Sequence, residues 1–311
     1  MITAFDIGGS TIKAASARDA DNVSVLSKRS TPLHDFQHFV AVIKELIVEN
    51  PNDSDGIAIS LTGVIDTDTG LAKCANIPCI DQRPMANDLE RELKQPVWIA
   101  NDADCFALAE THFGAARGHA NVFGVILGTG VGGALILDGK LVSGTGGFTG
   151  EWGHGPTLPN ESQFWPEPIP QFACGCGQKG CVDTIGGARG LERMHQHLHN
   201  ADLPSTEIIG KWLSKELAAT QTVNCAIDLI SGPLAMVLNV TGSSIAPVGG
   251  GLSGTQQFVD QLDHAVRQKV LRKSKNPILV PSSCAIEPGL MGAAMLGFQK
   301  SPSSEFFPCN E

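Results

Sequence analysis

The spacing of apolar residues predicts an alternation of short strands and helices in the first third of the chain. Residues 2–30 contain three short runs of strand-like composition, separated by turn residues. Between residues 35 and 49, apolar side chains recur at three- and four-residue intervals, which is the spacing of one helix face. The further elements predicted here are a buried strand over 56–61, a helix over 85–93, a strand over 97–100 and a helix over 103–113.

The second part of the chain begins with the same order of elements. A strand over 122–127, a glycine-rich turn and strands over 134–137 and 140–142 follow the plan of residues 2–30. The chain therefore resembles two copies of one α/β unit that face each other. The remaining predicted elements are helices over 184–199, 205–217 and 220–239, a strand over 243–248, a helix ending near 271, a strand over 278–280 and a helix over 289–297.

Three alternating histidines, His195, His197 and His199, fall within the helix predicted over 184–199. Their spacing suggests a second metal site, but residues two apart on a helix do not share a face. We expect these side chains to lie on the solvated surface.

The composition narrows the range of partners. A chain of 311 residues with 42% hydrophobic composition fits a soluble globular protein with a large core. The formal net charge of −10 argues against nonspecific binding to nucleic acid or to an anionic membrane. The pattern shows neither a signal peptide nor a transmembrane span. Six scattered cysteines without a disulfide-like pattern favour a reducing cytoplasm; they are Cys74, Cys79, Cys105, Cys225, Cys284 and Cys309.

Three further cysteines are close together in the sequence. Cys174, Cys176 and Cys181 are separated by small and polar residues, so their sulfurs can turn toward one point. A nearby histidine, such as His154, can complete a tetrahedral Cys3His zinc site. Four protein ligands leave no open position, so such a zinc would be structural. The alternative is a loop with three ordinary small apolar cysteines.

Two glycine-rich turns could bind phosphate. Gly8 and Gly9 follow Asp6 between the first two predicted strands, and residues 128–133 occupy the corresponding turn of the second copy. Adjacent glycines let the backbone turn tightly and expose N–H groups to an anion. A plain hairpin turn would use the same residues.

Asn101 and Asp102 lie at the carboxyl end of the strand predicted over 97–100, just before a helix. Ligands of open α/β sheets gather at this end of the strands, which favours a catalytic role. Both residue types are also common helix N-caps, and one residue could serve both purposes.

Two segments match the G-x-G-x-x-G fingerprint of dinucleotide-binding proteins, but neither has its context. Residues 128–133 are followed by a hairpin instead of a helix, and residues 249–254 lack an acidic residue about twenty positions later. No G-x-x-x-x-G-K-[ST] motif occurs either. Three separate glycine turns instead fit a nucleotide held in a cleft between two lobes.

With these glycine turns and the cysteine cluster, the chain resembles the ROK family of sugar kinases over residues 5–297. The resemblance rests on Asp6-Ile-Gly-Gly-Ser-Thr11, Gly128-Thr-Gly-Val-Gly-Gly133, Val248-Gly-Gly-Gly251, Glu151-Trp-Gly-His154 and Cys174-Gly-Cys176 with Cys181. It implies the actin-like ATPase (ribonuclease H-like) fold, with two duplicated α/β lobes around a cleft. The implied lobes are residues 1–117, joined by the C-terminal helix at about 288–300, and residues 118–287, which carry a zinc-binding loop over 151–183.

The resemblance also implies ATP-dependent phosphorylation of the 6-hydroxyl group of an N-acetylhexosamine. Asp102 would be the general base, and Mg²⁺ would accompany ATP. The implied ATP-binding residues are Asp6, Gly8, Gly9, Ser10, Thr11, Lys13, Gly128, Thr129, Gly130, Gly132, Gly133, Gly249, Gly250 and Gly251. The implied zinc ligands are His154, Cys174, Cys176 and Cys181.

The sugar ligands implied by the resemblance are Gly63, Asn76, Asn101, Asp102, Glu151, His154 and Asp183. The family commonly has glutamate at the last position, so Asp183 has one methylene less reach. Within the family, the motifs are most similar to N-acetylglucosamine kinases. Glucokinase, fructokinase, N-acetylmannosamine kinase and a sugar-sensing regulator without its DNA-binding module remain alternatives, and a homodimer is expected from the resemblance.

Overall fold

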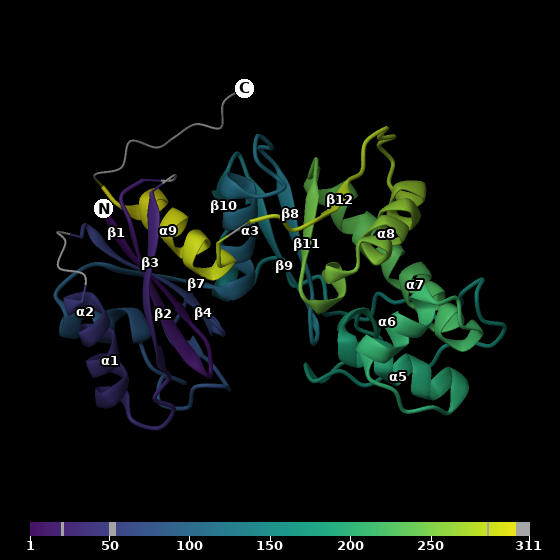
Figure 1. Ribbon diagram of the computed structural model, residues 1–311, viewed down its shortest axis with the longest axis horizontal. Coiled ribbons are helices and arrows are strands. Elements are labelled where there is room, and N and C mark those ends of the chain that lie inside the picture. Colours follow the sequence, from purple (N-terminus) through teal and green to yellow (C-terminus); the bar gives the residue numbers. More distant parts are fainter. Residues whose placement is uncertain (20–21, 50–53, 285, 303–311) are drawn as a thin grey trace. The chain divides into compact units, whose positions relative to one another are not determined.

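The computed structural model describes residues 1–19, 22–49, 54–284 and 286–302 (Figure 1). The end of the chain after residue 302, including Cys309, lies outside the described residues. The chain divides into two compact units. The first comprises Met1–Ala120, Leu135–Thr149 and Ser283–Glu311, and the second comprises Asn121–Ala134 and Gly150–Ser282.

Residues 135–149 belong to the first unit, whereas the expected lobe boundaries assigned them to the second. Gly147 lies so close to Ile65 that a Cβ atom would be 2.2 Å from the Ile65 carbonyl oxygen. The ammonium group of Lys73 lies 5.1 Å from the centre of the Phe148 ring. These contacts fasten the segment to the first unit, and the sequence does not reveal them because the segment continues a hairpin that starts in the second.

The first unit contains a five-stranded sheet in the order β3-β2-β1-β4-β7. Its strands are β1 (Ile2–Ile7), β2 (Thr11–Ala17), β3 (Val23–Ser30), β4 (Gly56–Leu61) and β7 (Val97–Asn101). The first three are antiparallel, and β4 and β7 run parallel to β1. Ile7 pairs with Leu61 and Leu61 with Asn101, so the three parallel strands end together. This edge is where an open α/β sheet positions its ligands.

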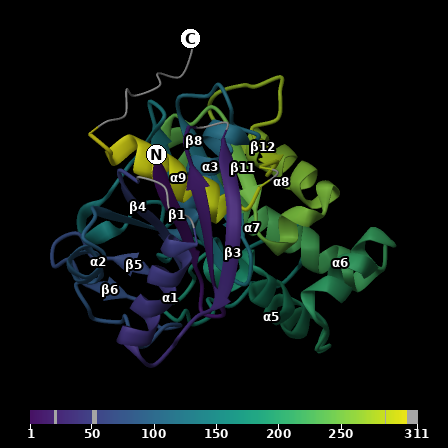
Figure 2. The same cartoon turned by 60° about the vertical axis from the view of Figure 1, so that its left-hand side comes forward.

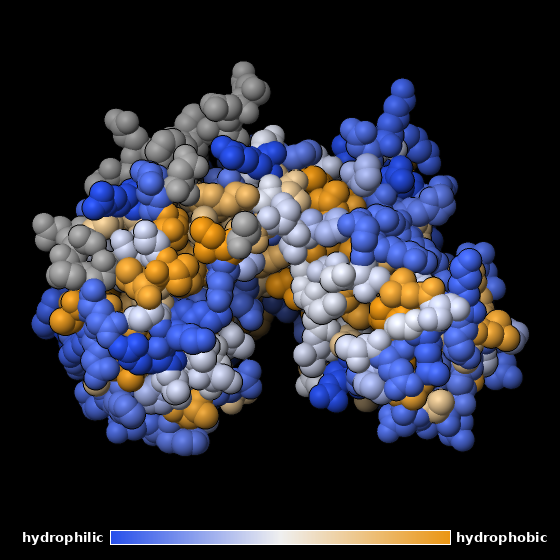
Figure 3. All heavy atoms as spheres, in the orientation of Figure 1, coloured by the Kyte–Doolittle hydropathy of each residue, from blue (hydrophilic) through white to orange (hydrophobic). Residues whose placement is uncertain are grey.

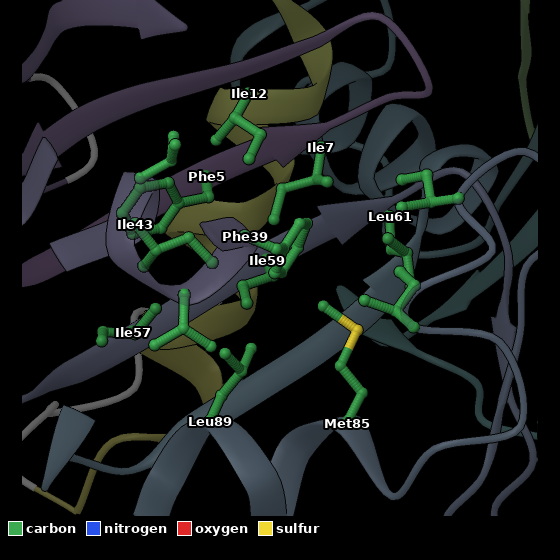
Figure 4. Packing of buried hydrophobic residues seen from close by; sticks show 14 of the residues in the cluster. Phe5, Ile7, Ile12, Phe39, Ile43, Ile57, Ile59, Leu61, Met85 and Leu89 are labelled. Atoms are coloured by element: carbon green, nitrogen blue, oxygen red, sulfur yellow. The ribbon is translucent and has the colours of Figure 1, made fainter. Parts of the chain in front are cut away.

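Helices α1 (Phe36–Val48) and α2 (Met85–Leu93) pack on one face of this sheet (Figure 4). Phe39 and Met85 point toward Phe5 and Ile59, and all four side chains belong to one buried cluster. The odd-numbered residues of β1 and β4 therefore form the main core of the unit, because alternate side chains of a strand share a face.

Helices α3 (Asp102–Phe113) and α9 (Pro288–Lys300) contact each other, and α9 also contacts β1 and β4. In both views α9 runs beside β1 (Figures 1 and 2). The backbones of α9 and α3 approach closely at Gly292, where a Cβ atom would lie 1.9 Å from the Cys105 carbonyl oxygen. The small residues of α9 thus permit a contact that a larger side chain would prevent. A two-stranded sheet, β5 (Val64–Ile65) with β6 (Ala72–Lys73), completes the unit.

The second sheet has the order β10-β9-β8-β11-β12. Its strands are β8 (Val122–Leu127), β9 (Val131–Leu137), β10 (Lys140–Leu141), β11 (Ala246–Gly249) and β12 (Leu279–Pro281). Strands β8, β11 and β12 are parallel, as β1, β4 and β7 are in the first sheet. The two sheets share one plan, which confirms the duplication predicted from the sequence.

The helices of the second unit lie together in Figure 2 and follow the predicted order with different boundaries. They are α4 (Asp183–Gly186), α5 (Ala188–His199), α6 (Ser205–Leu213), α7 (Leu217–Thr241) and α8 (Gln256–Lys269). Two short 3-10 helices, η1 (Thr145–Gly147) and η2 (Gly251–Gly254), lie in the loops. The helix predicted over 184–199 is interrupted at Gly187, where a Cβ atom would lie 2.7 Å from Gly130 Cα. This close approach accounts for the break.

Among the described helices, α7 is long and apolar enough to cross a membrane by length and composition. It packs against α5, α6 and α8, and more than half of its most apolar stretch is buried. These are the contacts of a core helix. On the face shown in Figure 3, hydrophilic residues predominate on each unit, with smaller groups of hydrophobic residues between them.

The expectation of a solvated surface is wrong for His195. This side chain is buried, and its Nδ1 lies 2.8 Å from the Thr222 hydroxyl. Burial lowers the pKa of both His195 and His199. His195 and His199 are four residues apart and therefore do share a helix face, with 5.0 Å between their ring centres.

Candidate active site

The turn between β1 and β2 is tightly held. The Gly8 N–H donates to the Thr11 carbonyl over 3.0 Å, and the Thr31 hydroxyl donates to the Gly8 carbonyl over 2.7 Å. Gly9 lies against Asn76, since a Cβ atom on Gly9 would be 3.3 Å from the Asn76 carbonyl oxygen. The first predicted phosphate turn and the predicted sugar ligand Asn76 are therefore neighbours.

Asp6 lies just before this turn and contacts two polar side chains. The Ser60 hydroxyl donates to Asp6 Oδ1 over 2.9 Å, and Lys13 Nζ lies 3.8 Å from Asp6 Oδ2. Lys13 also forms an ion pair with Glu287. Burial raises the pKa of Asp6, and the charge of Glu287 adds to this, while Ser60 and Lys13 oppose it.

The sequence interpretation did not identify Ser60, Glu287 or Gly289 as parts of this site. A Cβ atom at Gly289 would lie 2.4 Å from Asp6 Oδ1, so glycine allows α9 to begin against the carboxylate. Ser60 is the one hydroxyl in the apolar run of β4, which is a signal that could have found it. Glu287 and Gly289 carry no comparable signal, because only the fold brings α9 beside β1.

Asn101 and Asp102 differ in their roles at the start of α3. Asn101 is the N-cap, and its Oδ1 accepts from the Asp104 N–H over 2.6 Å. The Asp102 side chain is exposed to solvent, and its Oδ1 accepts from the Ala103 N–H over 2.9 Å. Partial desolvation raises the pKa of Asp102 and the negative charge of Asp6 raises it further, whereas the Ala103 N–H lowers it. The two carboxylates therefore influence each other.

Gly63 positions the loop that carries Asn76. Its φ angle is +154°, and a Cβ atom would lie 2.8 Å from the Lys73 carbonyl oxygen. The Cys74 thiol donates to the Thr62 carbonyl over 2.9 Å. The first unit thus gathers Gly63, Asn76, Asn101 and Asp102 with the Asp6 turn at one edge of its sheet.

The glycine turn over 128–133 is held by the residues that start α5. The Gly128 carbonyl accepts from the Ala188 N–H over 2.8 Å, and the Thr129 carbonyl accepts from the Arg189 N–H over 3.2 Å. Gly250, with φ +91°, lies on the other side, where a Cβ atom would be 2.6 Å from the Gly128 nitrogen. Two of the three predicted nucleotide segments are therefore in contact within the second unit.

The structure brings the four predicted zinc ligands together. The ligand atoms of His154, Cys174, Cys176 and Cys181 all lie within 4.8 Å of one another. The sulfurs of Cys176 and Cys181 are 3.6 Å apart, and His154 Nδ1 is 3.6 Å from the Cys174 sulfur. Tetrahedral zinc with sulfur ligands at about 2.3 Å fits such separations.

The thiols of this cluster differ in acidity. Hydrogen bonding from the Gln178 N–H, assisted by the neighbouring thiols, lowers the pKa of Cys176 to about 7. Burial raises the pKa of Cys181 to about 11. One thiolate therefore forms readily, and a bound metal would displace the remaining protons.

The two nitrogens of His154 face different groups. Nδ1 faces the Cys174 sulfur, and Nε2 lies 3.9 Å from Glu151 Oε2. Burial raises the pKa of Glu151, and His154 opposes this rise. The indole N–H of Trp152, which lies between Glu151 and His154 in the sequence, donates to the Gly132 carbonyl over 2.8 Å. Residues 151–154 are therefore fixed against the glycine turn as well as against the cysteines.

Asp183 is also directed toward the turn. Its Oδ1 accepts from the Val131 N–H over 2.8 Å, and its Oδ2 lies 3.9 Å from the Cys174 sulfur. Its own N–H donates to the Gly153 carbonyl over 2.9 Å. The second unit thus joins Glu151, His154 and Asp183 to the cysteine cluster and to the turn over 128–133.

Known proteins resemble the chain over almost its whole length. The family model described as "ROK family" matches residues 2–300. The N-acetyl-D-glucosamine kinase of Yersinia pseudotuberculosis serotype O:3 (strain YPIII) is 32% identical over 300 residues, which cover 95% of this chain and 98% of the relative. The N-acetyl-D-glucosamine kinase of Photobacterium profundum is 32% identical over 304 residues, which cover 96% of this chain and 100% of the relative.

A solved structure, the ROK hexokinase of Thermus thermophilus, has a TM-score of 0.81 to this chain at 26% identity, covering 96% of this chain and 98% of the other. The paired sheets with one strand order are those of the actin-like ATPase fold, as expected. With a family match over nearly its whole length, the chain belongs to the ROK family.

Proposed function

We propose that this ROK-family sugar kinase transfers the γ-phosphoryl group of ATP to the 6-hydroxyl group of N-acetyl-D-glucosamine. The observation that supports this best is the position of Asp102, at the first residue of α3 and close enough to the Asp6 turn for the two charges to interact. The choice of acceptor is supported by the relatives from Yersinia and Photobacterium, which are named N-acetyl-D-glucosamine kinases.

Asp102 would act as the general base. Phosphoryl transfer depends mainly on positioning and on stabilisation of charge, with one group accepting the proton of the attacking hydroxyl. The exposed Asp102 carboxylate is available to a bound hydroxyl group, and its raised pKa makes it a stronger base than an ordinary aspartate. Aspartate is ordinarily ionised at neutral pH, which is the form that accepts a proton.

The two glycine turns would bind the phosphates. The backbone N–H groups of Gly9, Ser10 and Thr11 in the first unit, and those of Gly130, Gly132 and Gly133 in the second, suit an anion, whereas the Val131 N–H is bonded to Asp183. Lys13 would supply a positive charge, and Asp6 would orient Mg²⁺ through water. Bound with ATP, Mg²⁺ neutralises charge on the transferring phosphates. Residues 249–251 would lie against adenosine, where the absence of side chains permits close contact.

Each unit would supply ligands for the sugar. Asn101 uses its Oδ1 as the helix cap, so its amide N–H₂ would donate to a sugar hydroxyl. Gly63 and Asn76 would complete the contacts from the first unit. Glu151 and the Nε2 atom of His154 would bind hydroxyls from the second, since Nδ1 faces the cysteines.

The cysteine cluster fits a structural zinc ion. Three sulfurs and His154 Nδ1 make a complete tetrahedral set, so no position remains for a reacting water. Zinc would hold the ring of His154 in one tautomer and orientation, with Nε2–H free to donate.

We also propose a cytoplasmic homodimer. The cysteines of the described residues are free, which suits a reducing compartment. Exposed apolar side chains at Met236 and Val240 of α7 and at Leu271 offer a surface for a second copy of the chain.

A comparison of kcat/KM among four sugars tests the proposed acceptor. We expect N-acetyl-D-glucosamine to exceed N-acetyl-D-mannosamine, glucose and fructose, with ATP hydrolysis in the absence of sugar as the background. A higher value for glucose would instead make the chain a hexokinase, like the Thermus protein. Sugar binding without turnover of any of the four would contradict the kinase and favour a sugar-sensing regulator.

A further inference from the structure

Asp183 contacts three segments that the sequence separates widely. Its Oδ1 accepts from the Val131 N–H over 2.8 Å, and its N–H donates to the Gly153 carbonyl over 2.9 Å. Its Oδ2 lies 3.9 Å from the Cys174 sulfur. The residue therefore joins the start of β9 to both halves of the cysteine–histidine cluster.

The same stretch of chain holds the rest of the glycine turn. The Ala188 and Arg189 N–H groups donate to the Gly128 and Thr129 carbonyls, and Gly187 lies against Gly130. Residues 183–189 thus contact four consecutive residues of the turn, from Gly128 to Val131. Asp183 provides the contact at Val131, where a hydrogen bond to a charged acceptor is stronger than a neutral one.

The space at Gly130 shows how closely the Asp183 carboxylate approaches the glycine turn. A Cβ atom on Gly130 would lie 2.4 Å from Asp183 Oδ1 and 3.4 Å from Asp183 Cγ, and the third near atom is also of Asp183. Gly130 is not in the left-handed region, so alanine is compatible with its backbone. The carboxylate alone therefore requires glycine at this position.

We propose that Asp183 is a positioning residue for the turn over 128–133 instead of a sugar ligand, and that it links the position of this turn to the cysteine–histidine cluster. The inference rests on the proposed function in that the turn binds nucleotide phosphates. It differs from the role implied by family resemblance because Oδ1 accepts from the Val131 N–H and Oδ2 faces the Cys174 sulfur. Without Asp183, the N–H groups of the turn would be less well preorganised for an anion.

The first test separates nucleotide binding from sugar binding. In Asp183→Ala, we expect the Kd for Mg·ADP, measured without sugar by calorimetry, to rise about tenfold. The Kd for N-acetyl-D-glucosamine, measured without nucleotide, stays within about twofold of the wild type. Asp183→Asn keeps an oxygen that accepts from Val131 and should restore most of the nucleotide affinity. A sugar Kd that rises more than the ADP Kd would overturn the proposal.

A double-mutant cycle tests the contact itself. Gly130→Ala should weaken Mg·ADP binding in the wild-type background, because the new methyl group displaces the Asp183 carboxylate. In the Asp183→Ala background the same change meets no carboxylate, so its effect should largely disappear. Equal losses in both backgrounds would contradict the contact between Gly130 and Asp183.

Hydrogen exchange separates a failure of this inference from a failure of the proposed function. In the nucleotide-free protein, Asp183→Ala should increase amide exchange over residues 128–133 without lowering the zinc content. Removing zinc from the wild type should increase exchange over the same residues. Unchanged exchange in both would refute the positioning role. If the wild type does not bind Mg·ADP at all, the proposed function fails, and the exchange result still decides the role of Asp183.

Discussion

At the scale of single residues, the contacts in the structure distinguish the roles of two adjacent polar side chains. By residue type, either Asn101 or Asp102 could cap the helix or bind a sugar. In the structure, Asn101 is the N-cap of α3. The Asp102 carboxylate accepts from the adjacent Ala103 N–H and is exposed. The residue best placed to act as a base is thus the one that the cap does not use.

Replacement of Asp102 tests its role as the base. Asp102→Asn should lower kcat about 10³-fold, because a neutral amide cannot accept the proton of the attacking hydroxyl. Sugar affinity should change little, since the amide oxygen keeps the bond from Ala103. Steady-state kinetics and calorimetry measure the two effects, with Asp104→Asn in the same helical turn as the control. Substantial kcat in Asp102→Asn would exclude the assigned role.

The raised pKa of Asp102 also predicts a pH-dependent effect on stability. A carboxyl group with a higher pKa in the folded state stabilises the fold relatively more when protonated, so its ionised form costs stability at neutral pH. Asp102→Asn should therefore raise Tm at pH 7, and the difference should vanish once pH falls below the ordinary value of 3.8. Thermal unfolding at both pH values checks this sign; a lower Tm at pH 7 would contradict it.

At the scale of elements, glycines decide where helices can approach other segments. The sequence shows glycines in α6 and in α9 without distinguishing them. In the structure, Gly292 of α9 lies against the Cys105 carbonyl of α3, while Gly210 of α6 faces open space. The same substitution should therefore have opposite effects in the two helices.

Gly292→Ala should lower the free energy of unfolding by about 3 kcal/mol, because its Cβ would overlap the α3 backbone. Gly210→Ala should raise it by about 0.5 kcal/mol, because alanine favours the helix and has room. Urea unfolding monitored by circular dichroism measures both changes. Equal effects of the two substitutions would mean that close packing of α9 on α3 does not contribute to stability.

The cysteine–histidine loop supports a prediction at the same scale. Cys176→Ser removes one of four gathered ligands, so zinc per chain should fall together with Tm. The KM for the sugar should rise severalfold, since His154 belongs to the cluster and to the proposed sugar site. Metal analysis, thermal unfolding and kinetics measure these effects. Cys79→Ser, outside the cluster, is the control because a hydroxyl can also donate to the Pro32 carbonyl.

Loss of zinc without any change in KM would show that the cluster does not position His154. A protein that contains no zinc as purified from zinc-replete medium would refute the metal site itself. These two results differ, because the first concerns the link to the sugar and the second concerns the ligand set.

At the scale of the whole molecule, the exposed apolar residues bear on assembly. Val240 at 77% exposure and Leu271 at 87% belong to the second unit, and the Leu271 N–H donates to the Asn239 side chain. Leu271 therefore lies beside the end of α7 that carries Val240. Soluble proteins rarely leave a large apolar patch uncovered.

We expect a particle of twice the 32.7 kDa of one chain in light scattering. The double variant Val240→Asp with Leu271→Asp should be monomeric. Dimer formation would bury the two introduced carboxylates without charge partners, which is costly. Val48→Asp, on a comparably exposed valine of α1, should remain dimeric. A wild type that scatters as a single chain would contradict the homodimer.

Local patterns along the chain were enough to predict most of the strands and helices in their order, the duplication and the composition of the metal cluster. Apolar periodicity and turn residues are local signals, so β1, α1 and β7 could be predicted from short stretches. The cluster could be predicted because three of its ligands lie within eight residues and the fourth precedes them closely.

Contacts between segments that are distant in the chain became known only from the fold. Ser60 and Glu287 meet around Asp6 and Lys13 because parallel pairing and the path of α9 bring distant segments to one edge. His195 is buried because α7 covers its helix face. Asp183 accepts from the Val131 N–H because the fold brings residues 183–189 against the glycine turn, which no local pattern records. The amino-acid sequence determines which side chains are present, whereas tertiary packing determines which of them come into contact.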